Sequence, residues 1–90
     1  MKVSKDYILR EIAGEFMLVP VGAAAAKFNG LITMNEIGTF IFKALGEEQT
    51  EDSLLKKITV EYAVEEETAL ADLREFLGQL REVGALVEEN

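Results

Sequence analysis

Residues 65–83, EEETALADLREFLGQLREV, form the most strongly patterned stretch of the sequence. Apolar side chains recur there at spacings of three or four residues, the periodicity of one face of an α-helix. Three glutamates open the stretch at the positive end of the helix dipole, and Gly84 follows it as a stop signal. We therefore predict a helix from about Glu65 to Val83, with an apolar stripe made of Leu70, Leu73, Phe76, Leu77, Leu80 and Val83.

Two shorter helices are predicted upstream. Asn35 is a candidate N-cap for a helix that stops at Gly46, and Thr50 is the N-cap candidate for a helix that runs to about Tyr62. Gly38 lies inside the first of these helices, where glycine costs about 1 kcal/mol relative to alanine. We expect it to allow the close approach of another element.

The first third of the chain has strand-sized apolar runs and no helical period. Residues 7–12 and 16–21 flank the turn Ala13–Glu15 and predict a β-hairpin, with Pro20 at a strand end or an edge. Residues 31–34 predict a third strand, introduced by the turn dipeptide Asn29–Gly30. The alanine run at 23–26 is too short to nucleate a helix in isolation, so a connection is expected there.

Three strands followed by three helices predict an α+β domain spanning residues 1–90, compatible with a winged helix-turn-helix. A short extended piece at residues 85–87 closes the pattern.

Composition excludes several kinds of chemistry. The 90 residues include no cysteine and no histidine, which removes thiol nucleophiles, histidine-dependent triads and the common zinc sites. Nine basic and 17 acidic residues give a net charge of −8, which opposes nucleic acid as the main partner. The glutamate clusters fall at helix starts and chain ends, where the carboxylates contact solvent and cap the helices. No metal, cofactor or catalytic residue is therefore predicted. No stretch approaches the roughly 18 apolar residues of a membrane span, and a cytoplasmic protein is expected.

The third predicted strand offers an interaction site. Residues 31–34 carry no charge, and no lysine flanks them that would protect a sheet edge. An extended peptide could pair with this edge and place side chains against an apolar helix. Alternatively, the chain itself covers the edge, and Leu31, Ile32 and Met34 belong to the core.

Two segments resemble a known family. Residues 34–46, MNEIGTFIFKALG, and residues 72–87, DLREFLGQLREVGALV, are similar in content, order and spacing to the pyrroloquinoline-quinone biosynthesis protein D family. Met34 stands where the family has leucine, Phe42 where it has tryptophan, and Ala85 is an insertion before the closing Leu86–Val87.

The resemblance implies a non-catalytic peptide chaperone, also called a RiPP recognition element. Such a domain binds the leader of a ribosomally made precursor peptide and presents it to a modifying enzyme, typically a radical S-adenosylmethionine protein. The leader is expected as an added strand beside the third strand and against the third helix. Carried onto this sequence, the peptide-binding residues are Leu31, Ile32, Thr33, Met34, Leu70, Leu73, Arg74 and Leu77. Arg74 would pair with an acidic leader residue, or otherwise with Glu67, Glu75 or Asp72 on the surface.

Two other classes remain open from the sequence. A winged-helix DNA-binding regulator fits the predicted fold, although the negative charge argues against it. A structural subunit that pairs its open edge with a second copy would form a homodimer and bury the groove.

Overall fold

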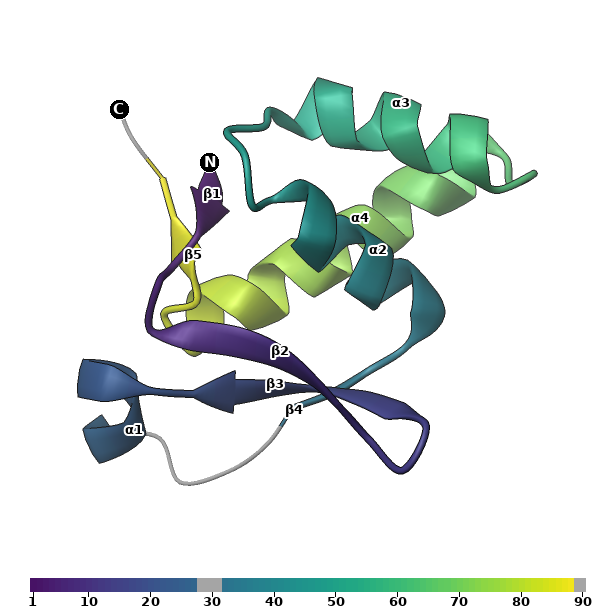
Figure 1. The fold of residues 1–90 in the computed structure, drawn as a ribbon. Coiled ribbons are helices and arrows are strands. Elements are labelled where there is room, and N and C mark those ends of the chain that lie inside the picture. The colour runs from purple at the N-terminus through teal and green to yellow at the C-terminus, as the bar shows by residue number, and fades with distance from the viewer. Residues whose placement is uncertain (28–31, 89–90) are drawn as a thin grey trace.

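A computed structural model describes residues 1–27 and 32–88 of the chain (Figure 1). Within these ranges there are five strands and four helices. The strands are β1 (Lys2–Val3), β2 (Tyr7–Ile12), β3 (Glu15–Pro20), β4 (Ile32–Met34) and β5 (Leu86–Val87). The helices are α1 (Gly22–Lys27), α2 (Glu36–Ala44), α3 (Glu51–Glu61) and α4 (Glu66–Glu82). The mixed α+β class is confirmed. The predicted elements omit β1 and α1, and β5 corresponds to the extended piece expected at residues 85–87.

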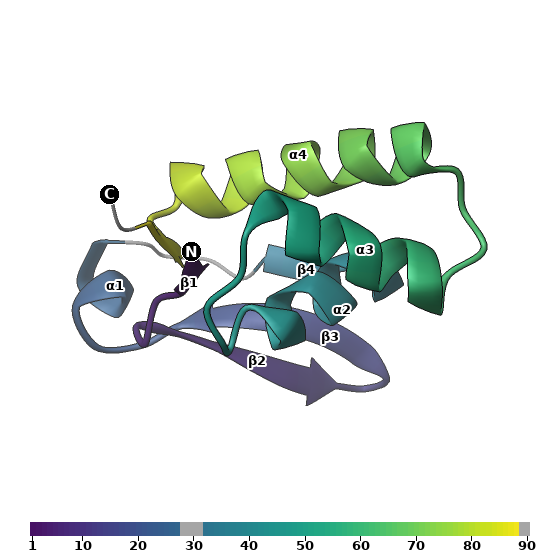
Figure 2. The same cartoon turned by 90° about the horizontal axis from the view of Figure 1, so that it is seen from above.

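The main sheet is antiparallel and small. Its strand order is β2–β3–β4, and a separate two-stranded sheet pairs β1 with β5. Figure 2 shows α2, α3 and α4 stacked on one side of the main sheet. Leu18, in the central strand, is fully buried against this helical layer, which places the core between sheet and helices.

The predicted hairpin is confirmed, with a tighter turn than expected. Ile12 pairs directly with Glu15, so the loop consists of Ala13 and Gly14 alone. Their φ angles are +53° and +83°. Positive φ at both central residues is the requirement of a type I′ turn, whose twist matches that of the flanking strands. Pro20 ends β3, as predicted.

The predicted N-caps form as expected. The Asn35 Oδ1 accepts a hydrogen bond of 2.7 Å from the backbone N–H of Gly38. Thr50 and Ser53 form a reciprocal capping box at the start of α3. An added Cβ at Gly38 would lie 3.0 Å from the Phe76 ring, so glycine at this position allows α2 and α4 to approach closely.

The alanine run is helical, whereas only a connection was expected there. The chain enters α1 through Gly22 at a φ of +57°, and the Val21 N–H donates to the Asp6 carbonyl at 2.7 Å. Ala24 packs against the core cluster. The nucleation argument holds for an isolated peptide, whereas here tertiary contacts hold the first turn in place.

The two ends of the chain are tied together by β1 and β5, of which only the second was predicted. Lys2 pairs with Val87 and Val3 with Leu86. Tyr7 links the sheet to the end of α4, because its hydroxyl donates to the Val83 carbonyl at 2.6 Å. The largest fully buried side chains come from β3 and from α2 with its C-cap, α3 and α4: Leu18, Ile41, Leu45, Leu54, Ile58, Leu73, Leu77 and Leu80.

Candidate functional site

Strand β4 has a free edge within the described part of the chain. β3 occupies one side of β4, pairing Met17 with Thr33 and Phe16 with Met34, and no described strand occupies the other side. Figure 2 shows β4 as the strand of the main sheet that lies nearest to α4. Unpaired N–H and C=O groups along such an edge can hydrogen-bond to an added strand.

Two hollows have residues of α4 in their walls. The first has a volume of about 160 Å³, lies beside the start of α2, and is lined by Asn35, Ile37, Gly38, Asp72, Glu75, Phe76 and Gln79. The second has a volume of about 530 Å³, lies beside α1, and is lined by Asp6, Tyr7, Ala23, Ala24, Lys27, Glu82, Val83 and Gly84. We call these two hollows, together with the free edge of β4, the α4 groove.

The α4 residues of the groove form one face of the helix. Asp72, Phe76, Gln79 and Val83 follow at spacings of four, three and four residues, which places them in line along the helix axis. Phe76 and Val83 are half-buried and pack against the edge of the core. The groove wall therefore combines apolar side chains with polar ones along a single helical face.

The structure places the predicted edge residues at β4 as far as it describes them. Leu31 lies outside the described residues. Thr33 is exposed, Ile32 is half-buried, and Met34 is buried at 7% exposure. Ile32 and Met34 pair with the core-facing positions Leu18 and Phe16, so their side chains anchor β4 to the helical layer.

The predicted helix wall lies partly in the core. Leu73 and Leu77 are 0% exposed and belong to the core, so they have no surface with which to contact a peptide. Leu70 is half-buried and packs against the same core. The sequence pattern identified the core-facing stripe of α4, whereas the groove-facing residues begin one position earlier, at Asp72 and Phe76.

Arg74 lies on another side of α4. Its guanidinium donates two hydrogen bonds to Glu51 of α3, at 3.0 Å from Nη2 and 3.3 Å from Nε. Successive helical residues are about 100° apart, so Arg74 is about 200° from Asp72 and points away from the groove. The partner is Glu51, and none of the three acidic residues expected from the sequence. The hydrogen bond from Arg74 lowers the pKa of the Glu51 carboxyl below its ordinary value.

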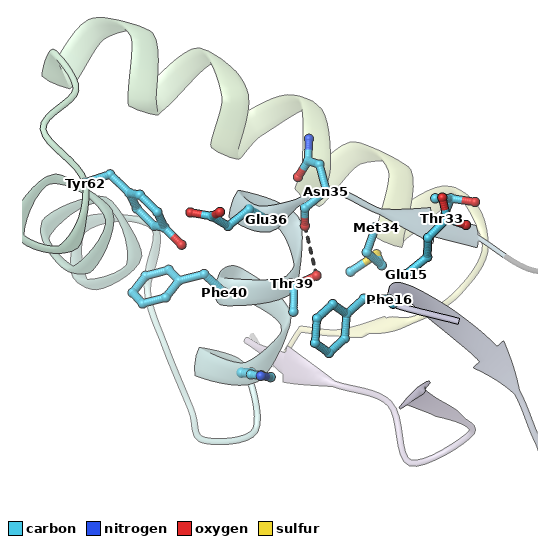
Figure 3. A pocket seen from close by; sticks show the side chains of 11 residues that line it. Glu15, Phe16, Thr33, Met34, Asn35, Glu36, Thr39, Phe40 and Tyr62 are labelled. Carbon is cyan, nitrogen blue, oxygen red and sulfur yellow. Dashed lines mark hydrogen bonds between the residues drawn. The ribbon is translucent and has the colours of Figure 1, made fainter. Parts of the chain in front are cut away.

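A further hollow lies between the start of β3, the end of β4 and α2 (Figure 3). It has a volume of about 490 Å³ and is lined by Gly14, Glu15, Phe16, Thr33, Met34, Asn35, Glu36, Thr39, Phe40, Lys43 and Tyr62. The Phe40 and Tyr62 rings meet edge to face at 5.4 Å, and the Lys43 ammonium lies 5.1 Å from the Phe16 ring centroid. Burial, followed by the charge of Glu36, raises the pKa of the Tyr62 hydroxyl.

Among the described residues, no group of three or more carboxylates is close enough to hold a metal ion. None of the described helices is both long enough and apolar enough to cross a bilayer.

Comparison with known proteins identifies the family. The family model described as coenzyme PQQ synthesis protein D (PqqD) matches residues 15–86, and the chain belongs to this family. Among solved structures, the same fold occurs in TbiB1 in complex with the TbiA(beta) leader peptide, with a TM-score of 0.77 and 24% sequence identity. That match covers 100% of this chain and 99% of the other. No match was found among the curated protein sequences. The resemblance inferred from residues 34–46 and 72–87 is thus confirmed.

The groove residues Asp72, Phe76, Gln79 and Val83 were not predicted as a site. The sequence pattern placed Phe76 and Val83 in the core stripe and Asp72 among the surface charges. One signal was available, because both apolar residues lie at the margin of the stripe, next to polar positions on the helix. A stripe wider than one neighbouring element can cover indicates a second contact surface.

Proposed function

We propose that this protein is a leader-peptide chaperone, a RiPP recognition element that holds the leader of a ribosomally made precursor peptide. The leader adds as a strand to the free edge of β4 and lays its side chains into the α4 groove. Family membership supports this assignment, and so does the fold shared with TbiB1, a protein solved with a leader peptide bound. The arrangement of β4, α2 and α4 is, in this proposal, that of a winged helix adapted to peptide capture.

The observation that carries the proposal is the free edge of β4 beside a hollowed helix face. The edge supplies main-chain hydrogen bonds, which hold any extended peptide, and the two hollows along α4 select side chains. Phe76 and Ile37 supply an apolar surface in the first hollow. Burial of one apolar leader side chain there contributes about 1.5–3 kcal/mol before the cost of ordering the peptide is subtracted.

The proposed role is presentation without catalysis. The single domain of residues 1–90 holds the leader in the cytoplasm, where precursor peptides are synthesised. A separate modifying enzyme, of the radical S-adenosylmethionine type in this proposal, then acts on the part of the precursor that extends from the groove. The product, whether pyrroloquinoline quinone or another modified peptide, is determined by the precursor and the enzyme.

The proposal is tested by titrating the ¹⁵N-labelled protein with the synthetic leader of the precursor peptide encoded beside its gene. A scrambled peptide of the same composition is the control. Amide shifts at Ile32–Met34 and along Asp72–Val83, absent with the scrambled peptide, are the expected result. Shifts at Phe40, Lys43 and Tyr62 without shifts at Ile32–Met34 would place the peptide elsewhere and contradict strand addition to β4.

A second copy of the chain competes for the same edge. If two chains paired through β4, light scattering would show a mass that rises with concentration, and the leader would fail to shift the β4 amides. A mass independent of concentration, together with leader-induced shifts, is the outcome that the chaperone proposal requires.

A further inference from the structure

The wall that α4 contributes to the α4 groove is acidic. Asp72 and Glu75 line the hollow beside the start of α2, and Glu82 lines the hollow beside α1. All three are exposed. None of them takes part in the ion pairs found among the described residues, which join Glu48, Glu51 and Glu88 to their partners.

The basic residues of α4 lie on the side of the helix away from this wall. Arg74 is held by Glu51 of α3, and Arg81 donates to Glu88 after β5 at 2.7 Å. Both guanidinium groups thus form ion pairs with carboxylates outside the groove.

The two hollows of the groove differ in charge. The hollow beside α1 contains Lys27 together with Asp6 and Glu82, so it has charges of both signs. The hollow beside the start of α2 contains Asp72 and Glu75, and no basic side chain lines it. An acidic ligand side chain would meet two uncompensated carboxylates there, whereas a lysine or arginine would gain two partners.

We propose that the α4 groove selects a basic leader peptide, with a lysine or arginine seated between Asp72 and Glu75 where the peptide passes Asn35. This inference rests on the proposed function, because it specifies the peptide class of the same groove. Next to the basic residue, an apolar side chain packs on Phe76 and Ile37. The net charge of −8 adds a longer-range attraction that speeds the encounter with a cationic peptide. The sequence-based expectation of an acidic leader residue at Arg74 is thereby replaced.

The probe is a library of random dodecapeptides displayed on phage and selected on the immobilised full chain. Enrichment of lysine or arginine beside an apolar residue, with depletion of aspartate and glutamate, is the expected result. Enriched peptides that bind the α4 groove without any charge preference would overturn the inference and leave the chaperone proposal intact. A selection that enriches no peptide would overturn the inference, and the titration with the precursor's own leader would then test the chaperone proposal separately.

Two matched double variants locate the effect, using the best selected peptide as the probe. Asp72→Asn with Glu75→Gln removes two charges from the groove, and Glu47→Gln with Glu67→Gln removes two charges from surfaces that line none of the hollows described above. The groove variant should bind roughly threefold to thirtyfold more weakly at low salt, the range expected for two exposed ion pairs. The control variant should lose at most the small long-range contribution. Equal losses in the two variants would show that only the overall charge matters and would overturn the assignment to Asp72 and Glu75.

Raising the salt concentration supplies an independent readout. The affinity of the wild-type protein for the basic peptide should fall with salt, and the groove variant should lose most of that dependence. A salt dependence that is unchanged in the groove variant would contradict the proposed pairing.

Discussion

Truncation of two adjacent residues on α4 separates the core from the groove. Leu77 is 0% exposed, and Leu77→Ala should lower the free energy of unfolding by about 2–5 kcal/mol through lost contacts and a cavity. Phe76 is half-buried at the edge of the core, and Phe76→Ala should cost about 1–2 kcal/mol, less than for a fully buried ring. A chain of 90 residues has roughly 5–13 kcal/mol in total, so Phe76→Ala should remain largely folded and Leu77→Ala at least partly folded at low temperature.

The two variants should rank in the reverse order when the loss of peptide affinity is compared. Leu77→Ala should bind the leader with wild-type affinity once the result is corrected for the folded fraction, because Leu77 offers no surface to a peptide. Phe76→Ala should weaken binding at least about tenfold, since an aromatic side chain in a groove is a common anchor of binding energy.

Urea denaturation measures the first quantity and titration calorimetry the second, on the same protein preparations. The volume-conserving variant Leu77→Met is a control that should change either quantity little. The reasoning would be refuted if Leu77→Ala kept wild-type stability and lost the leader, because Leu77 would then contact the peptide.

Four further predictions concern elements that support the groove. Ala13→Asn should raise the free energy of unfolding by about 0.5–1 kcal/mol, because Ala13 has a φ of +53° that asparagine tolerates better; an unchanged urea midpoint would contradict this. Thr50→Ala should lower it by about 1 kcal/mol by removing the N-cap of α3, and Thr50→Ser should retain most of the stability. Tyr7→Phe should lower it by about 1–2 kcal/mol, because the Val83 carbonyl loses its hydroxyl donor, and a neutral result would mean that water replaces it. Arg74 lowers the pKa of Glu51 below 4.5, so the small stabilisation from this exposed pair is present above that pH and lost as the pH falls through the folded-state pKa. Urea midpoints of wild type and Glu51→Gln should therefore converge in acid, and a constant difference down to full protonation would contradict the assignment.

Much of the fold could be predicted from local patterns. The caps at Asn35 and Thr50 and the helical period of α4 are encoded in neighbouring residues, and each formed as expected. Gly38 was expected to permit a close approach, and Phe76 is the side chain that approaches it. These features depend on hydrogen bonds and sterics within a few residues.

The missed elements depend on contacts between distant residues. β1 becomes a strand only because β5 returns beside it at the other end of the chain. The helix α1 contains no side chain with a strong local signal, and its start is held by the Asp6 carbonyl. Neither partner is visible in the local sequence pattern.

The part of the candidate site at β4 could be predicted from the sequence, whereas the groove-facing residues of α4 could not. A strand edge follows from the order of short apolar runs. Which face of α4 lies in the core and which lines the groove depends instead on how α4 packs against α3. The stripe of α4 is broad enough to include Leu73 and Leu77, in the core, and Phe76, at the groove. Only the packed arrangement separates these two groups, and it also assigns Arg74 to Glu51.

The most direct test of peptide capture is amide hydrogen exchange at β4, measured with and without the leader of the precursor encoded beside the gene. Successive residues of a strand direct their N–H groups to opposite edges, so either Thr33 alone or both Ile32 and Met34 face the free side. Strand addition predicts that the outward-facing amides exchange quickly in the free protein and slowly in the complex, while those bonded to β3 change little. Outward-facing amides that exchange equally fast at saturating leader would contradict strand addition at β4.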